Sequence, residues 1–122
     1  MRRRTFRKLK AAAQRPQLHH YVYVVLLDCG VLKLRKIREI NPHRDEKKPC
    51  VYVGMTGLTP EERFVNHKQG LKAARLVKHY GIRLLPELYE VFNPMPFAAA
   101  AQMEKELAAD LRAQGYTVAG GY

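Results

Sequence analysis

Short apolar runs rich in β-branched and aromatic residues predict the strands of this 122-residue chain. The run at 21–27 reads YVYVVLL, which is typical of a largely buried strand. A second run begins at Cys50 and ends at Gly54, and Pro86 makes a third run irregular or places it at a sheet edge. The predicted strands are 21–27, 50–53 and 84–92, with weaker signals at 31–34 and 116–119.

Capping residues and the apolar spacing predict the helices. Thr59 can cap a helix, Pro60 suits a first turn and Glu62 completes a capping box, so a helix begins here and runs through His67. Gly70 is expected to break it. The further predictions are a helix at 71–80 that ends at Gly81, a long helix at 97–114 capped by Gly115, and an irregular loop at 35–49.

Positive charge is concentrated in three blocks of the chain, whose formal net charge is +11. The block at 1–15 has seven basic and no acidic residues, and predicts a flexible basic arm over 1–20. A basic insertion at 33–49 adds seven basic residues, and 63–83 adds six. An excess of this size favours a polyanionic partner, with nucleic acid as the default, over a solvated basic surface without a partner.

Composition excludes several other classes of protein. Hydrophobic residues make up 47% of the chain, which argues against disorder throughout. The longest apolar run is strand-sized and no apolar segment follows the opening arginines, so we expect a cytoplasmic protein without a membrane partner. Cys29 and Cys50 have no zinc-type spacing, so structural zinc is not expected.

Five polar residues stand at positions that could carry chemistry. Tyr23 and Tyr52 lie in the two strongest strands, and Arg63 and His67 are four apart, so they project from one helix face. Glu104 lies on the long helix. Taken singly, each has an ordinary structural explanation, because strand tyrosines usually pack in cores and helical charges are usually solvated.

The order and spacing of these residues resemble the GIY-YIG nuclease superfamily over residues 21 to about 120. The chain departs from that family by Tyr21 in place of a usual Gly, by a long basic spacer similar to that of restriction-type members, and by the lack of an Asn after the last helix. Thr117 or a backbone carbonyl is expected to replace that Asn. The matching segments are Tyr21-Val22-Tyr23, Tyr52-Val53-Gly54, Arg63 with His67, and Glu104 with Leu107-Ala108.

The resemblance implies a small α/β (α+β) sandwich, with a central, mostly antiparallel three-stranded sheet flanked by helices. It implies a metal-dependent endonuclease that hydrolyses phosphodiester bonds of DNA with a single Mg²⁺ or Mn²⁺ held by Glu104. Arg63 would bind the phosphate and His67 would accept or pass a proton. Tyr23 would activate water and Tyr52 would position the phosphate or the water, although these two roles can be exchanged.

The DNA-binding surface is expected to extend along basic residues at spacings of three and four that form one helical face: Lys68, Lys72, Arg75 and His79. The arm and the insertion would add phosphate contacts. Nothing in the chain separates DNA from RNA. A homodimer would supply a second active site for cleavage of both strands.

The alternative is a catalytically inactive or partner-dependent nucleic-acid-binding module of the same fold. The lack of the late Asn and the presence of Tyr21 favour this alternative. The joint presence of all five polar residues favours the nuclease.

Overall fold

The computed structural model describes residues 18–72 and 74–121, so the predicted basic arm lies outside the described residues except for its last three positions. Four strands form one open sheet in the order β3-β1-β2-β4. β1 is antiparallel to β2 and to β3, whereas β2 and β4 are parallel. The strands are β1 (Tyr21–Leu27), β2 (Cys50–Thr56), β3 (Gly81–Leu84) and β4 (Thr117–Gly120).

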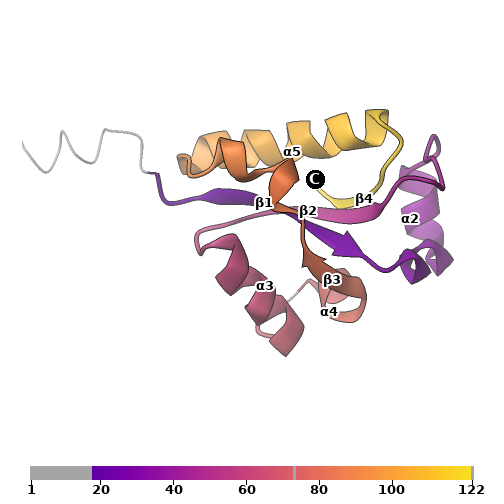
Figure 1. Cartoon of the computed structure of the whole chain (residues 1–122), viewed down its shortest axis with the longest axis horizontal. Helices are drawn as coiled ribbons and strands as arrows, with labels where there is room; N and C mark the ends of the chain where they lie inside the picture. Colours follow the sequence, from indigo (N-terminus) through magenta and orange to yellow (C-terminus); the bar gives the residue numbers. More distant parts are fainter. Residues whose placement is uncertain (1–17, 73, 122) are drawn as a thin grey trace, which may run out of the picture.

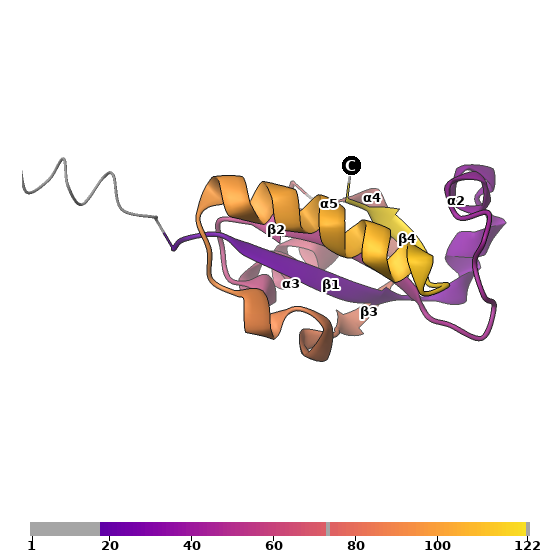
Figure 2. The ribbon, with the colours of Figure 1, turned by 90° about the horizontal axis from the view of Figure 1, so that it is seen from above.

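Helices cover both faces of the sheet (Figure 1). The long helix α5 (Phe97–Ala113) packs on β1, β2 and β4, and α3 (Pro60–Gln69) and α4 (Arg75–Tyr80) pack on β1 and β3 from the other side. The view from above shows α5 lying along the sheet (Figure 2). This mixed α/β arrangement explains why β1 is apolar without interruption: a central strand between two helical layers is buried on both faces.

The sheet corrects the expectation of three strands. The weak strand signal near the C-terminus becomes β4, which joins the sheet at the outer edge of β2. In addition, β2 does not end at Gly54 but continues to Thr56, because Gly54 pairs with Tyr23 of β1. The strand predicted at 84–92 is also wrong: β3 ends at Leu84, since Pro86 has no N–H for a sheet and begins the first of two 3-10 turns, η2 (Pro86–Leu88) and η3 (Glu90–Phe92).

The basic insertion is more regular than predicted. The expected return strand at 31–34 is instead a 3-10 helix, η1 (Cys29–Lys33), which begins where the Asp28 carboxylate accepts a hydrogen bond from the Gly30 N–H. The expected loop contains a short helix, α2 (Arg35–Ile40), whose Ile37 is buried in the core. The amide of Asn41 then bonds both the N–H and the C=O of Val118, and so takes the place of a further strand beside β4.

The predicted helix signals in the middle of the chain are confirmed in most respects. Thr59 and Glu62 form the capping box of α3, and Gly70 ends that helix with a φ of 80°. The next helix begins at Arg75, later than expected, and ends at Tyr80. Within the described residues, no helix combines the length and the apolar character that a bilayer crossing requires.

Candidate active site

A pocket of about 290 Å³ lies where β4 stops and β2 continues. β4 pairs with β2 only as far as Val53, opposite Gly120, whereas β2 extends to Thr56. In Figure 1, β2 passes between α5 on one side and α3 and α4 on the other. Side chains from both helical layers line the pocket, with Arg75 and Leu76 from α4 and Glu104 from α5. The pocket is lined by Tyr52, Val53, Ala74, Arg75, Leu76, Glu104, Gly120 and Gly121.

Tyr23 and His67 meet behind this edge. The Tyr23 hydroxyl lies 2.7 Å from Nε2 of His67, and the two side chains are 1% and 0% exposed. Tyr23 is in β1 and His67 is in the last turn of α3, so strand pairing and helix packing together fix the contact. Such a buried hydrogen bond holds both rings in a single arrangement.

The second ring nitrogen of His67 determines which atom carries the proton. Nδ1 accepts a hydrogen bond of 3.0 Å from the backbone N–H of Ala74. A neutral imidazole that accepts at Nδ1 carries its proton on Nε2, so His67 donates to the Tyr23 oxygen. Burial, together with the nearby positive charge of Arg63, lowers the pKa of His67 to about 4. His67 is therefore neutral at pH 7 and orients Tyr23, which differs from the expected exchange of a proton near neutral pH.

The environment of Tyr23 contains opposing influences on its ionisation. Burial and the proximity of Tyr52 raise the pKa of the Tyr23 hydroxyl well above its usual value. The Arg63 guanidinium opposes that rise through its charge and a side-chain hydrogen bond, and Glu104 adds to it. These influences place Arg63, Tyr52 and Glu104 close to one hydroxyl, which remains protonated until more positive charge is supplied.

Arg63 is anchored by backbone carbonyls of the connection between α3 and α4. Its Nη2 donates to the Lys72 carbonyl at 2.8 Å and its Nη1 to the Leu71 carbonyl at 3.4 Å. Arg63 lies one turn before His67 on α3, which confirms that the two share a helix face. Its guanidinium forms no ion pair with a carboxylate among the described residues, so its charge is available to an anion.

Tyr52 connects the buried pair to the pocket. Its ring centroid is 6.2 Å from that of Tyr23 and 6.1 Å from that of His67. Tyr52 is partly exposed and lines the pocket together with Glu104. It is therefore the tyrosine that a molecule in the pocket would contact.

Glu104 reaches the pocket from α5. Partial burial raises the pKa of its carboxyl group, while Lys105 and a hydrogen bond from the Met55 backbone lower it. Met55 lies in the part of β2 beyond β4, so Glu104 accepts from the strand edge that β4 leaves open. Glu106 instead accepts a hydrogen bond from Gln102 on the exposed side of α5.

The donor set at this edge fits a hard divalent cation held by one carboxylate. Mg²⁺ and Mn²⁺ prefer oxygen ligands and keep several waters, and Glu104 provides such an oxygen beside an open pocket. Residues 18–72 and 74–121 contain no cluster of three or more His, Cys, Asp or Glu that could hold a metal. Glu104 is the carboxylate of this pocket that could hold such an ion, with water or an anionic ligand completing its shell.

Small residues make the site possible: Gly54, which belongs to the matched segment Tyr52-Val53-Gly54, and Gly120 and Gly121, which the sequence analysis did not single out. A Cβ on Gly54 would lie 2.6 Å from the Tyr23 hydroxyl, so only glycine lets that ring cross β2. Gly120 and Gly121 both have positive φ, and a Cβ there would lie 2.3 Å from the Val53 carbonyl or from the Ala108 Cβ respectively. In the sequence, two consecutive glycines next to a predicted strand indicate that the backbone there lies close to another segment.

Thr117 does not take the place expected for the missing Asn. It pairs with Cys50 at the start of β4, where burial and the Cys29 thiol raise the pKa of the Cys50 thiol to about 11 and a hydrogen bond with the Thr117 side chain opposes that rise. Gly120, at the other end of β4, is the residue that reaches the pocket. The structure thus separates Thr117 from Glu104.

The four predicted nucleic-acid contacts do not form one helical face. Lys68 is in α3, Lys72 in the connection, and Arg75 and His79 in α4. Lys68 donates to the carbonyls of Lys78 and Gly81, so its ammonium group ties α3 to the end of α4. The remaining three side chains are exposed, and Arg75 also lines the pocket.

Comparison of the chain with models of known families, with curated proteins and with solved structures finds no match.

Proposed function

We propose that this chain is a metal-dependent endonuclease of the GIY-YIG type that hydrolyses phosphodiester bonds of DNA, with the four-stranded sandwich as its form of that fold. One observation carries the proposal: side chains from β1, β2, α3 and α5 surround the Tyr23 hydroxyl, directly behind the pocket that Tyr52 and Glu104 line at the open edge of β2. Tyr52, Arg63 and Glu104 all influence the hydroxyl of Tyr23, and His67 bonds to it. The same five residues carry the resemblance of the sequence to the GIY-YIG nuclease superfamily.

The chemistry of these groups suits attack of water on a phosphodiester. Arg63 offers a permanently charged, planar fork to the anionic phosphate, and Tyr52 borders the space where phosphate and water would lie. A divalent cation bound to Glu104 would supply charge neutralisation and a more acidic water.

Tyr23 is the proposed general base. Its oxygen accepts the Nε2–H of His67 and also interacts with Arg63, and both donors stabilise the phenolate form. The hydroxyl proton of Tyr23 passes to bulk water when the site is loaded, because His67 already carries a proton on Nε2 and cannot accept it. As a phenolate, Tyr23 then takes the proton of the attacking water, and Tyr52, which lines the pocket, takes it if the two roles are exchanged. Its buried hydroxyl is otherwise neutral, so the base forms only in a positively charged, loaded site.

Cleavage of a substrate panel tests the proposal. Labelled single strands, duplex, flap and branched DNA, and RNA would be incubated with Mg²⁺ or Mn²⁺ and with neither. The decisive comparison is Glu104→Gln against Glu106→Gln, because both change one carboxylate of α5 and only Glu104 lines the pocket. We expect Glu104→Gln to lower the cleavage rate at least a hundredfold and Glu106→Gln to change it less than twofold.

Other outcomes of this assay contradict the nuclease. Salt-sensitive binding without metal-dependent cleavage of any substrate would identify a nucleic-acid-binding module instead. Equal activity of the two variants would remove Glu104 from the mechanism. Cleavage confined to RNA would overturn the assignment to DNA.

A further inference from the structure

A second pocket, of about 360 Å³, lies between the turn after α2 and the C-terminal end of α5. Figure 2 shows this end of α5 directed toward α2. The pocket shares no residue with the candidate active site. Its lining is Ile40, Asn41, Pro42, His43, Arg44, Arg112, Ala113 and Tyr116.

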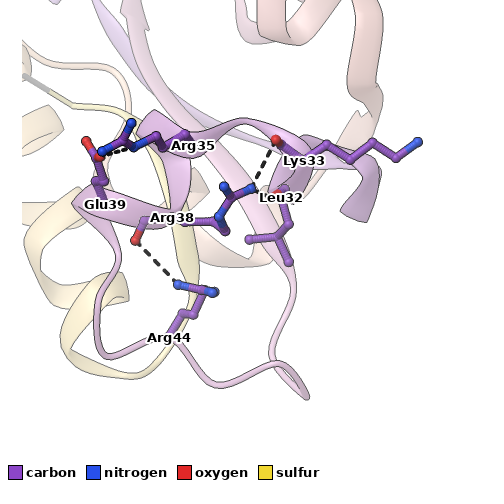
Figure 3. A network of polar contacts seen from close by, with 6 residues as sticks. All are labelled: Leu32, Lys33, Arg35, Arg38, Glu39 and Arg44. Carbon is purple, nitrogen blue, oxygen red and sulfur yellow. Dashed lines mark hydrogen bonds and ion pairs between the residues drawn. The ribbon is translucent and has the colours of Figure 1, made fainter.

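Two arginines of this pocket are held in place by backbone carbonyls. Arg44 donates from Nη1 to the carbonyl of Asn41 at 3.1 Å and more weakly to that of Arg38 (Figure 3). Arg112 donates from Nη2 to the carbonyls of Val118 and Gly120. Within the described residues, the Nε atoms of both arginines are buried without a hydrogen-bond partner. A buried donor on a charged group that has no acceptor destabilises the folded protein. This arrangement therefore favours a ligand that supplies an acceptor.

Neither guanidinium forms an ion pair with a carboxylate among the described residues, although Asp45 follows Arg44 in the chain and its backbone N–H bonds the carbonyl of Gly115. Among residues 18–72 and 74–121, the single ion pair is Arg35 with Glu39 on the exposed side of α2 (Figure 3). Lys48 adds positive charge, because its ammonium group lies 5.6 Å from the ring centroid of Tyr116. The pocket thus presents fixed positive charge to whatever enters it.

We propose that this pocket binds a backbone phosphate of the same nucleic-acid strand that is cleaved at the candidate active site; this inference rests on the proposed function. Arginine forks match the geometry of phosphate oxygens, and the net charge of +11 favours a polyanion over a small neutral ligand. Arg112 also connects the two sites physically, since it bonds the carbonyl of Gly120, which lines the active-site pocket.

The spacing of the two sites suits one strand. Glu104 and Arg112 lie on the same helix, α5, eight positions apart. At 1.5 Å per residue this is about 12 Å along the helix axis. One strand of a duplex advances about 3.4 Å per nucleotide, so the two pockets would engage phosphates about three or four nucleotides apart.

The first test places a carboxylate in the pocket. Ala113→Glu adds one negative charge at an exposed position that lines the pocket, and Ala109→Glu adds the same charge one turn earlier on α5, outside the lining. Both variants would be made in the Glu104→Gln background, so that binding of a labelled oligonucleotide is measured without cleavage. We expect Ala113→Glu to weaken binding at least fivefold and to raise the melting temperature, because the carboxylate pairs with the arginines. We expect Ala109→Glu to change the affinity less than twofold.

A second pair of variants removes charge. Arg44→Gln and Arg35→Gln each delete one arginine from the insertion, and only Arg44 lines the pocket. Arg44→Gln should weaken binding at least fivefold and reduce the slope of log affinity against log salt by about one. Arg35→Gln should change both quantities much less.

The results separate this site from the nuclease itself. Equal losses within either pair would indicate a general effect of charge and overturn the site. For the KM measurement, Ala113→Glu is made in the wild-type background. Cleavage by the wild type with no effect of Ala113→Glu on KM would retain the nuclease and discard the pocket. Selective loss of binding in Ala113→Glu, without cleavage of any substrate by the wild type, would retain the pocket and discard the nuclease. Perturbation of Tyr116 amide resonances by inorganic phosphate but not by oligonucleotide would assign the pocket to a small anion. Absence of any nucleic-acid binding would overturn both.

Discussion

The hydroxyl of Tyr23 lies 2.7 Å from Nε2 of His67, although the two residues are 44 positions apart in the chain. Because Ala74 occupies the other ring nitrogen, His67 is a neutral donor to Tyr23. This contact orients Tyr23, which we propose as the general base that activates water. The contact also makes the stability of the protein depend on pH.

Acid should weaken the fold through His67. Its pKa falls from an ordinary 6.5 to about 4 in the folded protein. Between pH 6.5 and pH 4, the unfolded chain therefore binds a proton on His67 and the folded chain does not. The contribution of the neutral imidazole to stability is complete above pH 6.5 and is lost as the pH falls toward 4. Denaturant unfolding should show wild type losing about 3 kcal/mol relative to His67→Gln across this range. Parallel curves for the two proteins would contradict the buried neutral imidazole.

Gly54→Ala should disturb Tyr23 directly. The added methyl would lie 2.6 Å from atoms of the Tyr23 ring, in a core without room for it. We expect a loss of about 1–3 kcal/mol in the free energy of unfolding, as for other overpacked cores, and a loss of cleavage. Gly57→Ala is the control, because its methyl would come only within 3.5 Å of the His20 ring at an exposed position. Equal stability of the two variants would show that the Tyr23 ring does not cross β2 at Gly54.

Glu104→Gln should make the protein more stable while it removes activity. Partial burial raises the pKa of Glu104, so the charged carboxylate is less stable in the folded protein than in the unfolded chain. The stability that the neutral carboxyl group provides is lost as the pH rises above the ordinary pKa of a glutamate. A glutamine oxygen can still accept from the Met55 backbone. At pH 7, chemical denaturation should give a higher midpoint for Glu104→Gln than for wild type. A lower midpoint would indicate that the carboxylate has a structural partner essential to folding.

Substitutions of Lys72 should change the stability of the fold and the affinity for DNA independently. Its φ of 48° lies in the left-handed region, where a side chain is strained, and the Arg63 guanidinium holds its carbonyl there. Lys72→Gly should raise the free energy of unfolding by about 1 kcal/mol relative to Lys72→Ala, which keeps the strain. Both variants should weaken DNA binding equally, because both lose the same ammonium group. Equal stability of the two variants would show that the backbone of Lys72 is not strained. Unequal DNA binding would show that loss of the ammonium group is not what weakens it.

The local features of the fold were predictable from the sequence. The apolar run at β1 and the capping box of α3 were each predicted because neighbouring residues alone determine them. The error at β2 had a different origin: Gly54 ends a strand by local preference, but pairing with Tyr23 carries the strand past it. In the same way, contacts of Ile37 with the core make a helix of a segment whose composition indicates a loop.

The sequence by itself determined which residue types stand in which order, and so identified Tyr23, Tyr52, Arg63, His67 and Glu104 as one candidate set. Helix periodicity also placed Arg63 beside His67, since that relation lies within one element. Only the tertiary structure decided that Ala74 fixes the His67 proton, that Gly54 within β2 admits the Tyr23 ring, and that Arg112 joins Arg44 in a second pocket. These contacts join segments distant in the chain, and their geometry depends on sheet register and helix packing, which no local sequence pattern specifies.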